Sequence, residues 1–84
     1  MKILAITRNV GDPAPYLEAE RQRTIELHGA GVLEHLWLKA DRSGAVLVLE
    51  VADAEEARRL LTTLPVVQSG AAELAAVIEL VPAV

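Results

Sequence analysis

The order of strand-like and helix-like segments constrains the fold of this chain more than any other feature. Four segments have the alternating or continuous apolar pattern of strands, and two have apolar residues at helical spacing. Glycine or proline punctuates most of the boundaries between them. In chain order the segments are a strand at 2–10, a helix at 13–28, strands at 32–40 and 45–51, a helix at 53–64 and a strand at 72–81.

This order is β-α-β-β-α-β, the ferredoxin-like arrangement of the α+β class. It predicts a four-stranded antiparallel sheet with both helices on one face. The 84 residues are enough for a single domain, residues 1–84. The last three strands are apolar on both faces, so the uncovered face needs a partner. The simplest partner is a second copy, packed sheet to sheet as a homodimer, and a higher oligomer is compatible with the same pattern.

Composition excludes several classes of function. The formal net charge is -4 and there is no basic run, which argues against a nucleic-acid partner. There is no cysteine and the two histidines are well apart, so we expect no disulfide and no metal site. No signal-peptide pattern and no apolar run of about 20 residues is present, so we expect a cytoplasmic protein without membrane contact.

One acidic residue breaks the apolar pattern of the first helix. At helical spacing a single face carries Leu17, Glu20, Thr24 and Leu27. The leucines predict that this face is buried, so Glu20 points inward. A buried carboxyl without a partner has a raised pKa, which suits a general base near neutral pH. The alternative is that Glu20 lies at the helix edge and pairs with Arg21 or Arg23.

Two further candidates lie on the second strand, where alternation places Leu33, His35 and Trp37 on one face. If that face meets the first helix, His35 is a candidate catalytic residue that would donate a hydrogen bond to a substrate. Trp37 would then form a wall of the substrate pocket. If the face points away from the helix, both become interface residues.

The remaining candidates would bind substrate. Arg21, next to Glu20, and Arg8, at the end of the first strand, would hold an anionic substrate with paired hydrogen bonds. Tyr16 lies one turn before Glu20 and would offer a hydroxyl. Each of these residues is also compatible with an ordinary position on the surface or, for Tyr16, in packing at the helix start.

The segment that begins at Glu20 continues with Leu27 and then with the pattern G-x-x-x-H-L-W, whose residues are Gly31, His35, Leu36 and Trp37. In these residues the segment resembles muconolactone isomerase. The pairs Leu64-Pro65 and Val81-Pro82 are similar too, so the likeness runs from Glu18 to near the end of the chain.

The resemblance implies a ferredoxin-like fold, a dimeric α+β barrel built by sheet-to-sheet packing, and often a higher oligomer. It also implies a cofactor-free isomerase that moves a proton and a double bond within a small unsaturated lactone acid. Its proposed base is a helix glutamate at the position of Glu20. The chain lacks the family's tyrosines after the second strand and its aromatic residues after Leu64-Pro65, which predicts a more aliphatic pocket and a different substrate.

Three other functions are compatible with the sequence. One is a cyclase and another is a cofactor-free monooxygenase on the same barrel, although aromatic residues make up only 2% of the chain and a monooxygenase pocket usually needs them. The third is a non-catalytic oligomeric protein that binds a small molecule. That function predicts a salt-bridged Glu20 with no pocket beside it.

Overall fold

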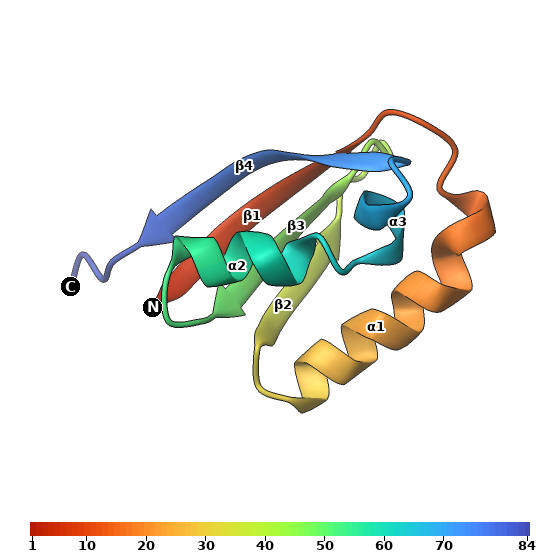
Figure 1. Ribbon diagram of the computed structural model, residues 1–84. Coiled ribbons are helices and arrows are strands. Elements are labelled where there is room, and N and C mark those ends of the chain that lie inside the picture. The colour runs from red at the N-terminus through yellow and green to blue at the C-terminus, as the bar shows by residue number, and fades with distance from the viewer.

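The computed structural model describes residues 1–84 as a four-stranded sheet with the helices on one face (Figure 1). The elements are β1 (Lys2–Asn9), the 3-10 turn η1 (Ala14–Tyr16), α1 (Leu17–Gly29), β2 (Leu33–Leu38), β3 (Ala45–Glu50), α2 (Ala54–Leu61), α3 (Pro65–Gln68) and β4 (Ala72–Leu80). The strand order is β2-β3-β1-β4 and every neighbouring pair is antiparallel. This confirms the predicted ferredoxin-like fold, with α3 as a short addition where a simple connection was expected.

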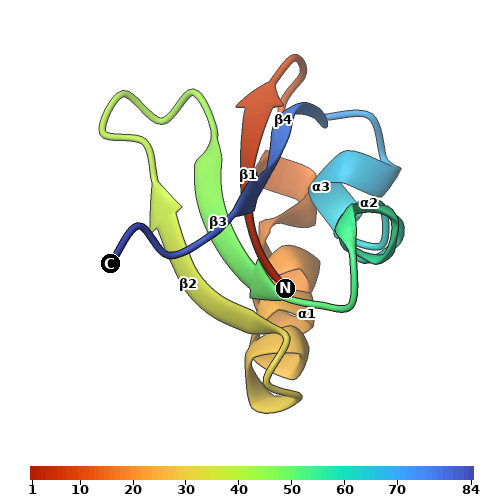
Figure 2. The ribbon, with the colours of Figure 1, turned by 90° about the vertical axis from the view of Figure 1, so that its left-hand side faces the viewer.

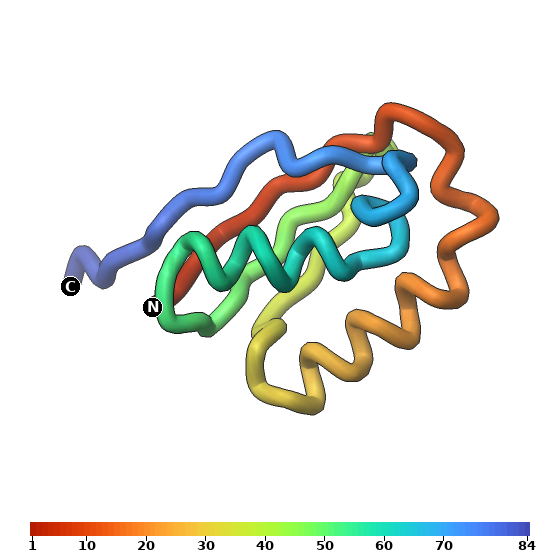
Figure 3. Tube along the Cα trace, in the orientation of Figure 1, coloured from red at the N-terminus to blue at the C-terminus, as the bar shows by residue number.

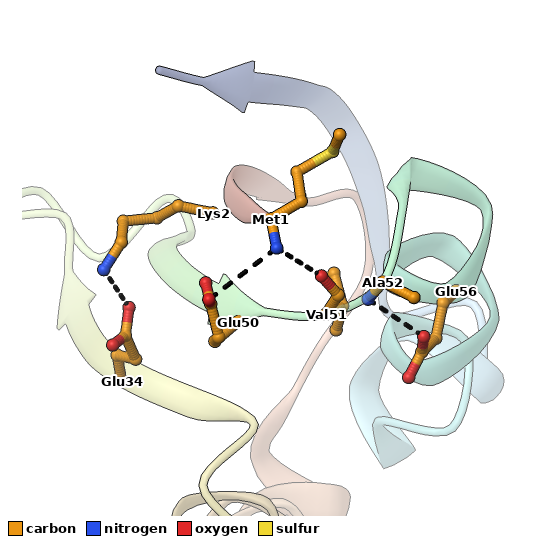
Figure 4. Close-up of polar contacts among 7 residues, drawn as sticks. All are labelled: Met1, Lys2, Glu34, Glu50, Val51, Ala52 and Glu56. Carbon is orange, nitrogen blue, oxygen red and sulfur yellow. Dashed lines mark hydrogen bonds and ion pairs between the residues drawn. The ribbon is translucent and has the colours of Figure 1, made fainter. Parts of the chain in front are cut away.

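Local capping explains where the helices begin. At α2, the Asp53 carboxylate accepts a hydrogen bond from Glu56 N at 2.8 Å and so caps the helix. The Glu56 side chain reaches back and accepts from Ala52 N at 3.0 Å (Figure 4). The first helix begins later than predicted, at Leu17, because η1 occupies the preceding residues. Pro13 is the N-cap residue of that turn, and Asp12, one residue earlier, accepts a hydrogen bond from Ala14 N at 3.0 Å.

A β-bulge in β2 changes which residues share a face. The register against β3 shifts between Leu33 and His35, so one extra residue is inserted there. Leu33 is buried on the helix side, and after the bulge Leu36 and Leu38 face that side again. The expectation that Leu33, His35 and Trp37 lie on one face is therefore wrong, since a one-residue shift reverses the faces.

The core lies between the sheet and the helices. Its fully buried members include Ile3 of β1, Leu47 and Leu49 of β3, and Leu61 and Leu64 at the end of α2 and just after it. Figure 2, turned by 90°, shows the helices on one side of the sheet and no element of the chain covering the other side. That open face is also apolar. Its residues from the four strands include Leu4, Ile6, Trp37, Val46, Val48 and Ile78.

The two ends of the sheet differ in what they carry. Both termini lie at one end, as the chain trace shows (Figure 3). There the Met1 ammonium donates to Val51 O at 2.7 Å and Lys2 Nζ donates to Glu34 Oε1 at 2.7 Å (Figure 4). The end of β1, the β2–β3 hairpin and the start of β4 lie together at the other end, with the start of α1 beside them.

No helix is long and apolar enough to cross a membrane.

Candidate functional site

A pocket of about 240 Å³ opens between the sheet and the start of α1, at the end away from the termini. Its walls are mainly aliphatic and include Leu17, Leu36, Leu38, Leu47 and Leu64. Four residues add side-chain polar groups, namely Thr7, Asn9, Glu20 and Arg42. An apolar cavity of ~150 Å³ in an engineered protein binds benzene. The pocket therefore has room for a single ring with small substituents.

Glu20 lies in this pocket and is partly buried. It forms no ion pair, because Arg23 instead donates to Glu26 at 3.1 Å and to Thr63 Oγ1 at 3.0 Å. Burial raises the pKa of the Glu20 carboxyl above its ordinary value, and a hydrogen bond from the Val66 backbone amide partly opposes that rise. The salt-bridged alternative that the sequence left open is not what the structure shows.

The hydrogen bond to Glu20 comes from the start of α3. Pro65 is the first residue of that helix and has no N–H, and Val66 N follows it without a backbone acceptor. Val66 N donates to Glu20 Oε1 at 3.1 Å. The bond holds the carboxyl in place through one oxygen, while Oε2 has no hydrogen-bond partner in the protein. Glu20 is thus anchored to α3 and still has an oxygen free for chemistry.

The polar side of the pocket is built where the β2–β3 hairpin meets β1. Thr7 is only 3% exposed, and its Oγ1 accepts from Ala45 N at 3.0 Å. Asn9 Nδ2 donates to the carbonyl of Arg42 at 3.0 Å. Gly44 permits this close approach, because a Cβ there would overlap the Thr7 carbonyl oxygen and lie 2.8 Å from the carbonyl carbon.

Arg42 is a cationic residue that borders the pocket and that sequence reasoning missed. It lies in the hairpin loop with a backbone φ angle of 64°, a left-handed conformation that is uncommon for residues other than glycine. It forms none of the protein's ion pairs, which join Met1 to Glu50, Lys2 to Glu34, Arg8 to Glu73 and Arg23 to Glu26. No carboxylate of the protein therefore neutralises the charge of its guanidinium.

The other predicted residues do not line the pocket that contains Glu20. His35 and Trp37 are on the open face of the sheet, where their rings stack with centroids 5.0 Å apart and an interplanar angle of 14°. Arg8 is also on that face, paired with Glu73. Arg21 and Tyr16 are exposed on α1 and η1, and neither lines the pocket.

Thr7 could have been found from the sequence, and Arg42 could not. Alternation along β1 puts Thr7 on the buried face with Ile3 and Ala5, which is the same anomaly that identified Glu20. Arg42 is one of several charged residues in a hairpin loop, and nothing local distinguishes it. No group of three or more His, Cys, Asp or Glu side chains is arranged to hold a metal ion.

The fold and the sequence of this chain are similar to those of known proteins. The 5-chloro-2-hydroxyhydroquinone dehydrochlorinase from Burkholderia phenoliruptrix, solved in complex with 2,5-dihydroxybenzoquinone, has a similar fold. The TM-score is 0.74 at 16% sequence identity, over 98% of this chain and 94% of that one. A search of curated proteins gave no match. The sequence profile of the muconolactone delta-isomerase family matches residues 12–82, most of the chain, so this protein belongs to that family.

Proposed function

We propose that this protein is a cofactor-free isomerase that moves a proton and a double bond within a small unsaturated lactone or organic acid, with Glu20 as the general base. The observation that carries the proposal is an unpaired, partly buried carboxylate in a small aliphatic pocket. A non-catalytic binding protein was expected to have a salt-bridged Glu20 and no pocket beside it. Neither feature is present, which favours the enzyme.

The chemistry needs only this one proton carrier. Ionised Glu20 removes a proton from a carbon next to the substrate carbonyl, and the electrons of the C–H bond form an enolate. The protonated carboxyl then returns the proton to a different carbon, which moves the double bond. Burial supports the first step, because a carboxyl with a raised pKa is a stronger base than an ordinary glutamate. The hydrogen bond from Val66 N keeps the carboxyl oriented throughout.

The pocket favours a small ring that carries a negative charge. Its aliphatic walls suit the ring, and Arg42 at the hairpin is the cation beside them. We therefore assign anion binding to Arg42 in place of Arg8 and Arg21, because Arg8 is paired with Glu73 and neither lines the pocket. The similar dehydrochlorinase was solved with a six-membered ring compound, which is compatible with a ligand of this size.

We also propose that the protein is a homodimer that packs sheet to sheet. Trp37 is 55% exposed and Ile78 46% exposed on the open face, which is a large apolar area for a small chain to leave in water. In that dimer the stacked His35 and Trp37 are interface residues, the alternative that the sequence left open for them. A higher oligomer is compatible with the same face.

The base assignment is tested with α-angelica lactone, a small unsaturated lactone with an acidic C–H bond. Proton exchange in heavy water and migration of the double bond are followed by NMR for the wild type and for Glu20→Gln. A positioned general base contributes roughly 10²–10⁴ in rate, so the variant should lose about that factor. Glu18→Gln is the matched control, because Glu18 lies on the same helix but is exposed and outside the pocket.

Three outcomes separate the candidate functions. Loss of rate in Glu20→Gln alone supports the isomerase. Equal rates in the two variants remove Glu20 as the base. Binding of the lactone with no exchange in the wild type favours the non-catalytic binding protein.

A further inference from the structure

We propose that the Thr7 hydroxyl donates a hydrogen bond to the substrate oxygen that becomes negatively charged when Glu20 removes a proton. This inference rests on the proposed isomerisation and adds a second catalytic residue to the pocket. Thr7 and Glu20 line the same pocket, Thr7 from β1 and Glu20 from α1. An enolate formed there would need a donor on the sheet side.

The hydroxyl proton of Thr7 takes part in no hydrogen bond within the protein. The side chain is almost fully buried, and its Oγ1 accepts a hydrogen bond from Ala45 N. A hydroxyl can donate one hydrogen bond as well as accept. No oxygen of the protein accepts a hydrogen bond from Thr7 Oγ1, so its proton has no partner within the chain. A ligand oxygen in the pocket can supply the missing acceptor.

The surroundings hold this hydroxyl in place before any ligand arrives. Gly44 lets the hairpin backbone contact the Thr7 backbone, which brings Ala45 N within 3.0 Å of Oγ1. On the other side, the register of β1 against β4 shifts between Ile6 and Thr7. The extra residue of that shift lies in β4, between Leu74 and Ala76, so β1 keeps its regular alternation and Thr7 stays on the buried face. A donor fixed in advance stabilises developing charge without rearrangement.

Other polar groups of the pocket are less suited to this task. The Asn9 amide already donates to the Arg42 carbonyl, and Arg42 itself is exposed at the hairpin. The hydrogen bond from Ala45 N also polarises the Thr7 hydroxyl and makes it a better donor. In the reaction the C–H proton passes to Glu20 and the electron pair moves onto the substrate oxygen. Thr7 gives that oxygen a hydrogen bond and keeps its own proton.

The test uses 4-nitrophenolate, a planar ring whose charged oxygen imitates the enolate and whose absorbance reports binding. It is carried out in the Glu20→Gln background, because glutamine imitates the protonated base and removes the charge that would repel the probe. Adding Thr7→Val should weaken binding by about 10- to 100-fold, the value of a hydrogen bond to a charged group. Adding Thr7→Ser, which keeps the hydroxyl, should restore binding to within about threefold.

A neutral probe separates loss of the hydroxyl from damage to the pocket. Valine leaves the Ala45 amide without its acceptor, so 4-nitrotoluene binding is measured in every variant. Unchanged 4-nitrotoluene binding with weakened 4-nitrophenolate binding supports the proposal. Equal loss of both probes on Thr7→Val means that Thr7 has only a structural function and overturns it.

Two further outcomes distinguish this inference from the proposed function. If Glu20→Gln tightens 4-nitrophenolate binding and Thr7→Val changes nothing, the Thr7 assignment fails and the pocket with its base stands. If 4-nitrophenolate binds to no variant at millimolar concentration, both the Thr7 donor and the enolate-forming pocket are overturned.

Discussion

Replacing Gly44 by alanine tests the junction on which the pocket depends. A Cβ at Gly44 would overlap the carbonyl oxygen of Thr7 and lie 3.2 Å from the Cα of Arg8. Both atoms belong to the backbone of β1, a strand held between β3 and β4, so neither can rotate away. The hairpin must move outward, which separates Ala45 N from Thr7 Oγ1.

The expected cost follows from these two effects. Forcing an extra carbon into a packed site costs about 1–3 kcal/mol, and backbone on both sides of the clash favours the upper part of that range. Losing the hydrogen bond to Thr7 adds about 1 kcal/mol. We expect Gly44→Ala to lower the free energy of unfolding by about 3 kcal/mol. For a chain of this length that is a fall of roughly 12–24 °C in Tm.

Urea denaturation followed by circular dichroism, at one fixed protein concentration, measures the change. Gly29→Ala is the control, since a Cβ at Gly29, the last residue of α1, meets nothing within 4 Å. Alanine there should stabilise the protein by up to about 1 kcal/mol, because it suits a helix better than glycine. If Gly44→Ala unfolds within about 0.5 kcal/mol of the wild type, the hairpin is not held against β1 and the argument for a fixed Thr7 fails.

Three other predictions concern charge and assembly. Burial raises the pKa of Glu20 above its ordinary value of 4.5, so between these two pKa values the folded protein binds a proton that the unfolded chain has lost. The free energy of unfolding therefore falls as pH rises from 4.5 through the raised pKa. Glu20→Gln should therefore be more stable than the wild type at pH 7 and lose that advantage below pH 4.5; an advantage that grows with acidification would contradict the burial argument. Trp37→Glu should convert the proposed dimer to a monomer, and a wild type that sediments as a clean monomer at micromolar concentration would rule the dimer out. Arg42→Gln should raise KM about tenfold for a lactone carrying a carboxylate and leave KM for a neutral lactone unchanged; equal effects on both would remove Arg42 as the anion-binding residue.

Local spacing in the sequence was enough to predict the order of elements and the position of Glu20. Strand and helix periods extend over only a few residues, so β-α-β-β-α-β could be read from the chain. The cap of α2 by Asp53 is equally local, because donor and acceptor are three residues apart. Helical spacing also placed Glu20 on a face with Thr24 and Leu27, which are buried. The expectation that Leu17 is buried on the same face is wrong, because it lies at the start of the helix, at the pocket, and is 55% exposed.

Only the tertiary structure decided what surrounds Glu20. Its hydrogen-bond partner Val66 is 46 residues away, and the partner of Thr7 is 38 residues away. A single extra residue in β2 turned His35 and Trp37 to the open face, and that choice depends on pairing with β3. Arg42 reaches the pocket because Asn9 and Gly44 fix the hairpin against β1. Periodicity fixes which face of its own element a residue occupies, but contacts between distant segments depend on register, bulges and close backbone approach, which no local pattern encodes.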